Sequence, residues 1–300
     1  MKVALLTSGG DAPGMNSVLI NLIHYTFDSD VQVSLVQDGF KGLLDNKFID
    51  VYNKNEYDNF LTEAGSFIYC ARSKEFITNW PIAIDNLKKN NIDVLVVIGG
   101  DGSFKGTQLL SNSIPTLFIP ATIDNDVKWS DYSIGFDSCL NEIINQSNKI
   151  IKTFKTHKNV VIVEVMGRYC SDLTNAAAKV IQPAIVLNHE NKKPINQIVD
   201  ELKEFYKQNN YGFILMSENL YSKDEIKELL TSIESNLNCA ARFDSLGYSQ
   251  RGANVTKYEL SVTNKFAKLV SELINNHIYN NAVLVNNHEV INISYESIKE

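Results

Sequence analysis

The chain is poor in cysteine, and the spacing of its cysteines excludes two kinds of site. Its 300 residues contain four of them, at Cys70, Cys139, Cys170 and Cys239. No two form a C-x-x-C pair, so neither a zinc site nor a disulfide framework is indicated. We expect reduced, mostly buried thiols.

Long apolar runs are also missing. No stretch approaches the ~18 residues that a membrane-spanning helix needs, and the apolar run after Lys2 is too short for the core of a signal peptide. We therefore expect a cytoplasmic protein that does not bind membranes.

An excess of positive charge is absent as well. The formal net charge is −7, which argues against a nucleic-acid or membrane-surface binder. A phosphorylated ligand would need a local cluster of positive groups. Arginine is the best such group, and the 28 basic residues include only Arg72, Arg168, Arg242 and Arg251.

Short apolar runs alternate with amphipathic segments. Strands are predicted at 3–6, 31–36, 94–98, 116–119, 160–165 and 213–216. Apolar residues at helical spacing predict helices over 136–151 and 262–274, and the polar segment 188–194 is typical of a surface connection. This order indicates an α/β protein with mainly parallel strands, of a length that suits two modest domains.

Four motifs follow strand-like runs, in the segments 7–16, 98–103, 120–126 and 165–170. In open α/β sheets, ligands gather at the carboxyl ends of the strands. The positions of the motifs therefore indicate binding sites.

The segment Ile98–Ser103 reads I-G-G-D-G-S. Gly100 and Gly102 let the backbone approach a phosphate, and Ser103 begins a helix whose free amides attract anions. Asp101 can hold the magnesium ion that accompanies a nucleotide. Alone, G-G-D-G also fits a plain strand-to-helix turn.

The segment Pro120–Asp126 reads P-A-T-I-D-N-D and supplies two carboxylates two residues apart. One of them can face a substrate hydroxyl as a base. A pair of aspartates capping a surface turn is the alternative. Together with the glycine-rich turn, this segment indicates phosphoryl transfer.

In their order and approximate separations, the four motifs resemble those of bacterial ATP-dependent 6-phosphofructokinases, over nearly the whole chain. The resemblance implies conversion of fructose 6-phosphate to fructose 1,6-bisphosphate in glycolysis, with ATP as donor and Mg²⁺ as cofactor. It implies two Rossmann-like α/β domains with mainly parallel sheets and the active site in the cleft between them. A nucleotide domain would comprise 1–136 and 250–285, and a sugar-phosphate domain 137–249 and 286–300. A homotetramer or another homo-oligomer is implied.

The resemblance also assigns residues. Asp124 would be the base, and Arg72 would lie between the donor and acceptor phosphates. Thr122 and Asp126 would orient the sugar or the metal-bound phosphates, and Asp101 would bind the metal. Nucleotide contacts are implied for Gly10, Arg72, Gly100, Asp101, Gly102, Ser103 and Gly106. Contacts to the sugar phosphate are implied for Thr122, Asp124, Asn159, Met166, Gly167, Arg168, Glu218, Arg242, Tyr248 and Arg251. Among these, Arg242 and Arg251 would clamp the 6-phosphate.

Some positions depart from the family pattern. Tyr248 replaces a histidine of the phosphate clamp, and Asn159 replaces an arginine that the family supplies from a neighbouring subunit. Tyr69 stands where the family usually has glycine. Pyrophosphate-dependent relatives carry bulkier residues at the positions of Gly102 and Ala121, so this chain favours ATP.

These departures leave two alternatives. The altered clamp also fits a kinase for another phosphosugar, such as tagatose 6-phosphate. It fits a non-catalytic regulatory paralogue that binds nucleotide, although such a protein has no physical need for the base Asp124.

Overall fold

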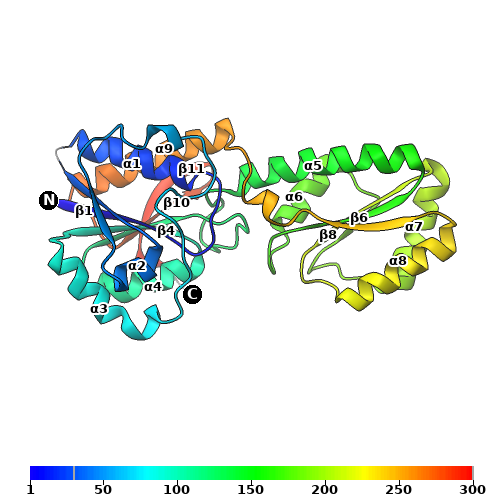
Figure 1. Ribbon diagram of the computed structural model, residues 1–300, viewed down its shortest axis with the longest axis horizontal. Coiled ribbons are helices and arrows are strands. Elements are labelled where there is room, and N and C mark those ends of the chain that lie inside the picture. Colours follow the sequence, from blue (N-terminus) through cyan, green and yellow to red (C-terminus); the bar gives the residue numbers. More distant parts are fainter. Residues whose placement is uncertain (30, 299–300) are drawn as a thin grey trace. The chain divides into compact units, whose positions relative to one another are not determined.

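The computed structural model describes residues 1–29 and 31–298. It divides the chain into two compact units, which we describe separately (Figure 1). Unit 1 comprises Met1–Ser138 together with the described residues from Arg251 onward, and unit 2 comprises Cys139–Gln250.

Unit 1 is built on a sheet of seven described strands in the order β11-β10-β5-β4-β1-β2-β3. The strands are β1 (Lys2–Ser8), β2 (Gln32–Val36), β3 (Phe48–Val51), β4 (Val94–Gly99), β5 (Thr116–Pro120), β10 (Asn281–Asn286) and β11 (Glu289–Ser294). The five central strands pair in parallel, and β3 and β11 run antiparallel to their neighbours. The central strands are almost wholly buried, as expected of parallel strands with helices on both faces.

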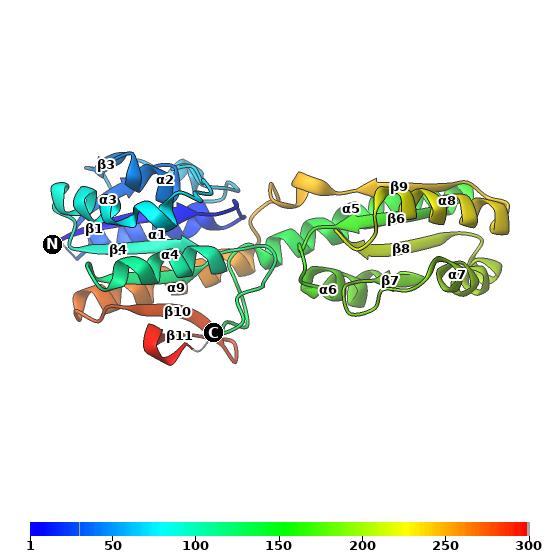
Figure 2. The same cartoon turned by 90° about the horizontal axis from the view of Figure 1, so that it is seen from below.

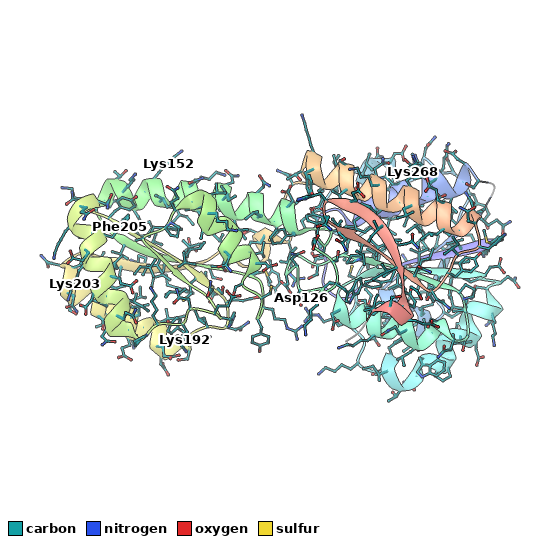
Figure 3. The ribbon with its side chains drawn as sticks, turned by 180° about the vertical axis from the view of Figure 1, so that it is seen from behind. Asp126, Lys152, Lys192, Lys203, Phe205 and Lys268 are labelled. Carbon is teal, nitrogen blue, oxygen red and sulfur yellow. The ribbon has the colours of Figure 1, made fainter. Side chains whose placement is uncertain are left out.

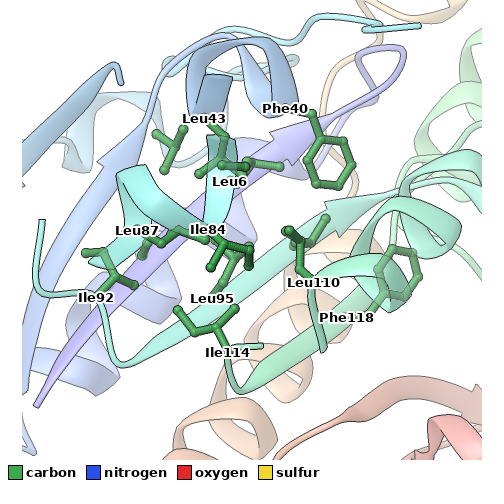
Figure 4. Close-up of a cluster of buried hydrophobic side chains, with 14 of the residues drawn as sticks. Leu6, Phe40, Leu43, Ile84, Leu87, Ile92, Leu95, Leu110, Ile114 and Phe118 are labelled. Atoms are coloured by element: carbon green, nitrogen blue, oxygen red, sulfur yellow. The ribbon is translucent and has the colours of Figure 1, made fainter. Parts of the chain in front are cut away.

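Helices cover both faces of this sheet (Figures 1 and 2). They are α1 (Met15–Phe27), α2 (Gly39–Leu44), α3 (Phe76–Lys89), α4 (Asp101–Ser111) and α9 (Lys257–Asn275), with the short 3₁₀ helices η1 (Asp58–Phe60) and η3 (Tyr295–Ser297). One apolar cluster joins α2, α3 and α4 to the sheet, with Leu6, Leu95 and Phe118 facing Phe40 and Ile84 (Figure 4). The helices α1 and α9 contact each other and cover the other face.

Unit 2 has a sheet of four described strands in the order β7-β8-β6-β9, and every pair is parallel. The strands are β6 (Val160–Val165), β7 (Ile185–Leu187), β8 (Gly212–Ser217) and β9 (Ala241–Ser245). The helices are α5 (Phe136–His157), α6 (Asp172–Ile181), α7 (Ile195–Asn209) and α8 (Lys223–Leu237), followed by η2 (Gly247–Gln250). The helices α7 and α8 pack an apolar cluster against one face of the sheet.

The predicted α/β class is confirmed, and each predicted strand and helix is present. The helix from 136 is α5, the helix at 262–274 lies within α9, and both keep lysines on their outer sides, such as Lys152 and Lys268 (Figure 3). Five strands were not predicted: β3, β7, β9, β10 and β11. Four of them are short or half polar, so they carry little of the apolar pattern that marks the central strands. The fifth, β10, is buried and apolar in its middle, and its apolar run was missed.

The placement of 286–300 with the sugar-phosphate domain is wrong for its described residues. The strand β11 pairs antiparallel with β10 from Glu289 to Ser294, which makes it an edge of the sheet of unit 1. Residues 299 and 300 lie outside the described part. Hairpin pairing with the preceding strand decides this placement.

The absences noted in the sequence have structural counterparts. Among the described residues, no helix combines the length and the apolar character needed to cross a bilayer. The four cysteines are free thiols, of which Cys139 is fully buried and the other three are half-buried.

Candidate functional site

Three of the four motifs meet at one edge of the sheet of unit 1. The strands β5, β4 and β1 are consecutive neighbours, and their parallel registers align Ser8 with Gly99 and Gly99 with Pro120. The loops after these strands therefore begin at the same level. The amide of Ala121 donates to the carbonyl of Gly99 at 2.8 Å, which extends the alignment into the loops.

The amino end of α4 lies in the middle of this edge. Gly100 is the N-cap residue and brings no capping side chain, so the first amides of the helix face an incoming anion. The buried Ser103 hydroxyl donates to the carbonyl of Ser8 at 3.3 Å and ties α4 to the end of β1. Asp101 is half-exposed, and its carboxylate lies 3.2 Å from the ammonium of Lys105 one turn along the helix.

The loop after β5 is held by its own side chains. The Asp124 amide donates to the Thr122 hydroxyl at 3.2 Å. Asn125 has a left-handed backbone, with φ of +52°, and its side-chain oxygen accepts from the amide and the hydroxyl of Ser133 at 2.9 and 3.1 Å. Asp124 and Asp126 are half-buried on this loop. Asp126 is labelled in Figure 3. A loop fixed in this way holds its carboxylates in place before any ligand arrives.

Arg72 belongs to a segment that runs beside the first motif. The Gly9 amide donates to the Ala71 carbonyl at 3.4 Å, and the Thr7 hydroxyl lies 2.8 Å from that of Ser66 and 3.1 Å from the Tyr69 carbonyl. Arg72 itself is exposed. The structure thus brings its backbone to the same edge as the three motifs, and its place between donor and acceptor phosphates stays a prediction.

Arg251 lies against the first motif. Its Nη1 donates to the backbone oxygen and the side-chain Oδ1 of Asp11, both at 3.3 Å, and a β-carbon on Gly10 would collide with it. The side chain is 14% exposed, and its Nε is buried without a hydrogen-bond partner in the described structure. Sequence reasoning placed Arg251 only with the sugar phosphate and missed its contact with the glycine-rich turn.

Two glycines assigned to the nucleotide differ in their surroundings. A β-carbon at Gly102 would meet nothing within 4 Å, so the space above it is open on the described part of the chain. At Gly106 a β-carbon would lie 2.8 Å from the ring of Phe40. Gly106 therefore serves the packing of α4 on the core, and its contact with nucleotide stays a prediction.

A magnesium ion can be held here only if a bound nucleotide supplies some of its oxygen ligands. The described residues contain no group of three or more histidine, cysteine or acidic side chains able to hold a metal. The lone Asp101 carboxylate at the amino end of α4 suits a magnesium ion that takes its other oxygens from phosphates and water. The residues present therefore fit a metal that arrives with a nucleotide.

Within unit 2 the fourth motif lies at the carboxyl edge of the sheet. Met166, Gly167 and Arg168 follow β6, and Glu218 follows the neighbouring strand β8. Glu218 accepts from the Arg168 amide at 2.7 Å. The turn needs Gly167, because its φ is +134° and a β-carbon there would lie 2.7 Å from the Cys170 carbonyl.

The end of β9 completes this edge. The side chain of the buried Gln250 accepts from the Met166 amide at 3.0 Å, and Tyr248 is 83% exposed on η2. The Ser245 hydroxyl donates to Glu164 at 2.9 Å. Burial raises the pKa of the Glu164 carboxyl above its ordinary value, with a smaller contribution from the charge of Glu218.

The sequence matches the phosphofructokinase family over residues 2–274. The chain belongs to this family. It is 35% identical to a probable ATP-dependent 6-phosphofructokinase of Malacoplasma penetrans, covering 99% of this chain and 94% of that protein. It is 32% identical to the ATP-dependent 6-phosphofructokinase of Staphylococcus aureus, covering 99% and 93%.

Solved phosphofructokinases have the same fold. The structure from Saccharomyces cerevisiae matches with a TM-score of 0.87 at 24% identity, covering 97% of this chain and 44% of that one. This chain thus spans less than half the length of the yeast protein. A pyrophosphate-dependent phosphofructokinase from Marinobacter aquaeolei matches with a TM-score of 0.88 at 17% identity, covering 99% and 83%.

Two residues expected to contact the sugar phosphate, Arg242 and Asn159, lie away from the motif of unit 2. Arg242 is the second residue of β9, registers with Val161, and forms an ion pair with Glu234 at 3.1 Å. Asn159 directly precedes β6, where its side-chain oxygen accepts from the Ala240 amide at 3.2 Å. Both are at the amino edge of the sheet, whereas Met166–Arg168 and Glu218 are at its carboxyl edge.

Arg242 and Arg251 belong to different units, and each has its own carboxylate partner, Glu234 and Asp11 respectively. A clamp that the two arginines form on the 6-phosphate stays a prediction.

The sequence analysis also missed His189. It follows β7 at the carboxyl edge of unit 2, two residues after the end of the strand. A histidine two residues after a short apolar run was a signal that could have found it.

Proposed function

We propose that the chain transfers the terminal phosphoryl group of ATP to fructose 6-phosphate and forms fructose 1,6-bisphosphate. The convergence of the β1, β4 and β5 loops carries this proposal, because it gathers an anion-binding helix end and the aspartates of the β5 loop at one sheet edge. Membership of the phosphofructokinase family and the names of the relatives support it.

The donor would bind over the amino end of α4. Gly100 and Gly102 leave room for its phosphates, Gly10 borders them from the β1 loop, and Ser103 holds the helix end in place. The open space above Gly102 favours a nucleotide over pyrophosphate. Asp101 would hold Mg²⁺, which supplies positive charge to the transferred phosphoryl oxygens.

Asp124 would accept the proton of the attacking sugar hydroxyl. An aspartate has an ordinary pKa of ~3.9 and is a weak base, so it takes the proton late, as the hydroxyl bonds to phosphorus. Thr122 and Asp126 would orient the reacting groups. The Arg72 guanidinium can follow the negative charge as it moves between donor and acceptor.

Several groups can bind the sugar phosphate. Arg168 and Glu218, with the Met166–Gly167 backbone, lie at the carboxyl edge of unit 2 and can bind sugar hydroxyls. Arg251 and Tyr248 can bind the 6-phosphate.

Asn159 and Arg242 lie at the other edge of unit 2, so we propose that they serve the site of a second copy of the chain in a homo-oligomer.

The test is ADP release by the purified protein with magnesium and ATP, over a panel of phosphosugars that includes tagatose 6-phosphate. Asp124→Ser should lower turnover at saturating fructose 6-phosphate by orders of magnitude and leave ATP binding intact. Asp200→Ser is the matched control, because Asp200 is exposed on α7 and forms only a surface pair with Lys203.

Each result has a distinct meaning. Turnover with fructose 6-phosphate that depends on Asp124 establishes the kinase. A strong preference for another sugar would move the assignment to the alternative phosphosugar kinase. No turnover on any sugar, with ATP still bound, would favour the regulatory paralogue. The exposed Tyr248 and the amide at Asn159, which replace a histidine and an arginine of the family pattern, would then explain the loss of sugar-phosphate binding.

A further inference from the structure

His189 holds two backbone carbonyls from one ring nitrogen. Its Nε2 lies 3.1 Å from the Arg168 carbonyl and 3.0 Å from the Glu218 carbonyl. A carbonyl can only accept a hydrogen bond, so Nε2 carries the proton and donates to both. His189 therefore links the turn after β6 to the turn after β8.

The two linked residues carry the side chains expected to face the sugar. Arg168 has a left-handed backbone, with φ of +55°, and follows Gly167 in a tight turn. Its amide is bound by Glu218, so a ring closes from His189 through both residues. Because a left-handed backbone is unfavourable for arginine, the turn needs such contacts to persist.

His189 is itself held rigidly. The buried Asn188 bonds Asn175 at 2.7 Å and accepts from the Glu190 amide at 3.0 Å, which fixes the backbone on both sides of His189. The edge of Tyr169 packs against the imidazole, with ring centroids 5.8 Å apart. The ring thus has one orientation, with Nε2 directed at the two carbonyls.

We propose that His189 is a positioning residue for the sugar-phosphate side of the site. It sets the spacing of Arg168 and Glu218 through their backbones and touches neither the nucleotide nor the reacting atoms. Its loss should weaken binding of the sugar phosphate and leave binding of ATP unchanged. The role in sugar-phosphate binding rests on the proposed function. The claim that His189 holds the turns after β6 and β8 does not.

The test compares His189→Leu with His189→Gln. Leucine fills the space and removes the donor, whereas the glutamine Nε can donate from nearly the position of the histidine Nε2. His189→Leu should raise KM for fructose 6-phosphate about tenfold with KM for ATP changed less than about twofold, as for other residues that orient a ligand-binding group. His189→Gln should recover most of the loss. His277→Leu, at an exposed histidine of unit 1, should leave both KM values unchanged.

Amide hydrogen exchange on the free protein gives a second measurement that needs no activity. His189→Leu should speed exchange in peptides covering 166–170 and 217–220, and His189→Gln should not. If the wild type turns over no sugar phosphate, the proposed function fails, and the exchange data still decide whether His189 holds the turns. Unchanged exchange in His189→Leu would overturn the inference. Faster exchange with an unchanged KM, or an equal rise in both KM values, would refute the role in sugar binding.

Discussion

Tyr69 adopts a backbone conformation that suits glycine. Its φ is +64° in the turn closed by its amide on the Ser66 carbonyl, and its side chain is 60% exposed. This conformation explains why the family usually has glycine at the position. The turn leads to Arg72. The hydrogen bond from the Thr7 hydroxyl to the Tyr69 carbonyl holds the segment in place, so the chain keeps this backbone conformation despite its cost in free energy.

Replacing Tyr69 by glycine should stabilise the protein. The left-handed conformation costs a non-glycine residue ~1–2 kcal/mol, and glycine loses about 0.5–1 kcal/mol more entropy on folding, so a net gain of up to about 1.5 kcal/mol is expected. Urea unfolding of Tyr69→Gly against Tyr69→Ala isolates the effect, because alanine removes the ring but keeps the β-carbon. If Tyr69→Gly is less stable than Tyr69→Ala by about 0.5–1 kcal/mol, which is the entropy difference alone, the turn is not strained.

At the level of elements, a buried carboxylate of α9 caps the first turn of α5, whose residues up to Ser138 belong to unit 1. Glu259 of α9 is fully buried and accepts from the Tyr132 hydroxyl at 2.7 Å and from the Gly135 amide at 3.0 Å. It also accepts from the Ser138 amide and hydroxyl at 3.4 and 3.1 Å, so it caps the first turn of α5. Burial raises the pKa of Glu259 to about 7, against the opposing effect of these hydrogen bonds.

This pKa predicts the direction of a pH effect. Between the ordinary pKa of 4.5 and about 7, the folded state binds more protons at Glu259 than the unfolded state does. The stability from this residue is therefore full below pH 4.5 and decreases as the pH rises to about 7, by roughly 3.5 kcal/mol at most at ~1.4 kcal/mol per pKa unit.

Glu259→Gln removes this titration. At both pH 5 and pH 8 the variant loses some hydrogen bonds, because an amide replaces the carboxyl group. Only the wild type also loses stability as the pH rises, so the free energy of unfolding of the variant minus that of wild type should be more favourable to the variant at pH 8 than at pH 5. Glu272→Gln, at an exposed position of the same helix, is the control. A difference between Glu259→Gln and wild type that is the same at both pH values would mean that the pKa of Glu259 does not change on folding.

Periodicity predicted the buried elements better than the edges. The strands β1, β4, β5, β6 and β8 are apolar along their length, and the sequence located them. The strands β3, β9 and β11 expose much of their surface, so apolar periodicity does not mark them. Their place depends on pairing with a strand already in the sheet.

At the scale of the whole molecule, the two edges of unit 2 indicate how copies would cooperate. A strand rises ~3.3 Å per residue, so Arg242 near the start of β9 is well separated from the residues that follow β6 and β8. Under the proposed function, an arginine at that edge would contribute to the sugar-phosphate site of another copy. The family pattern at Asn159 leads to the same expectation.

Mixing two impaired variants tests this arrangement. Asp124→Ser lacks the base and Arg242→Ala lacks the arginine, so a mixed oligomer contains sites with Asp124 from one chain and Arg242 from another. Random mixing of equal amounts after co-expression should restore about a quarter of the wild-type activity at low fructose 6-phosphate, as expected for a two-chain site. A mixture of Asp124→Ser with Thr122→Val should stay inactive, because both residues belong to one loop. Failure of the first mixture to recover would show that Arg242 does not serve the site of another copy.

The α/β class, most of the buried parallel strands and the segments that carry the site could be predicted from the sequence, because burial on both faces and glycine-rich turns are local properties of the chain. The positions of the motifs after strand-like runs also indicated binding sites at the carboxyl ends of parallel strands. The remaining features depend on the tertiary structure. Sheet order placed β11 in unit 1, strand direction separated Arg242 from Glu218, and contacts between distant segments brought Arg251 to Asp11 and His189 to two carbonyls. Such contacts depend on which segments become neighbours in space, and no local pattern in the chain encodes that choice.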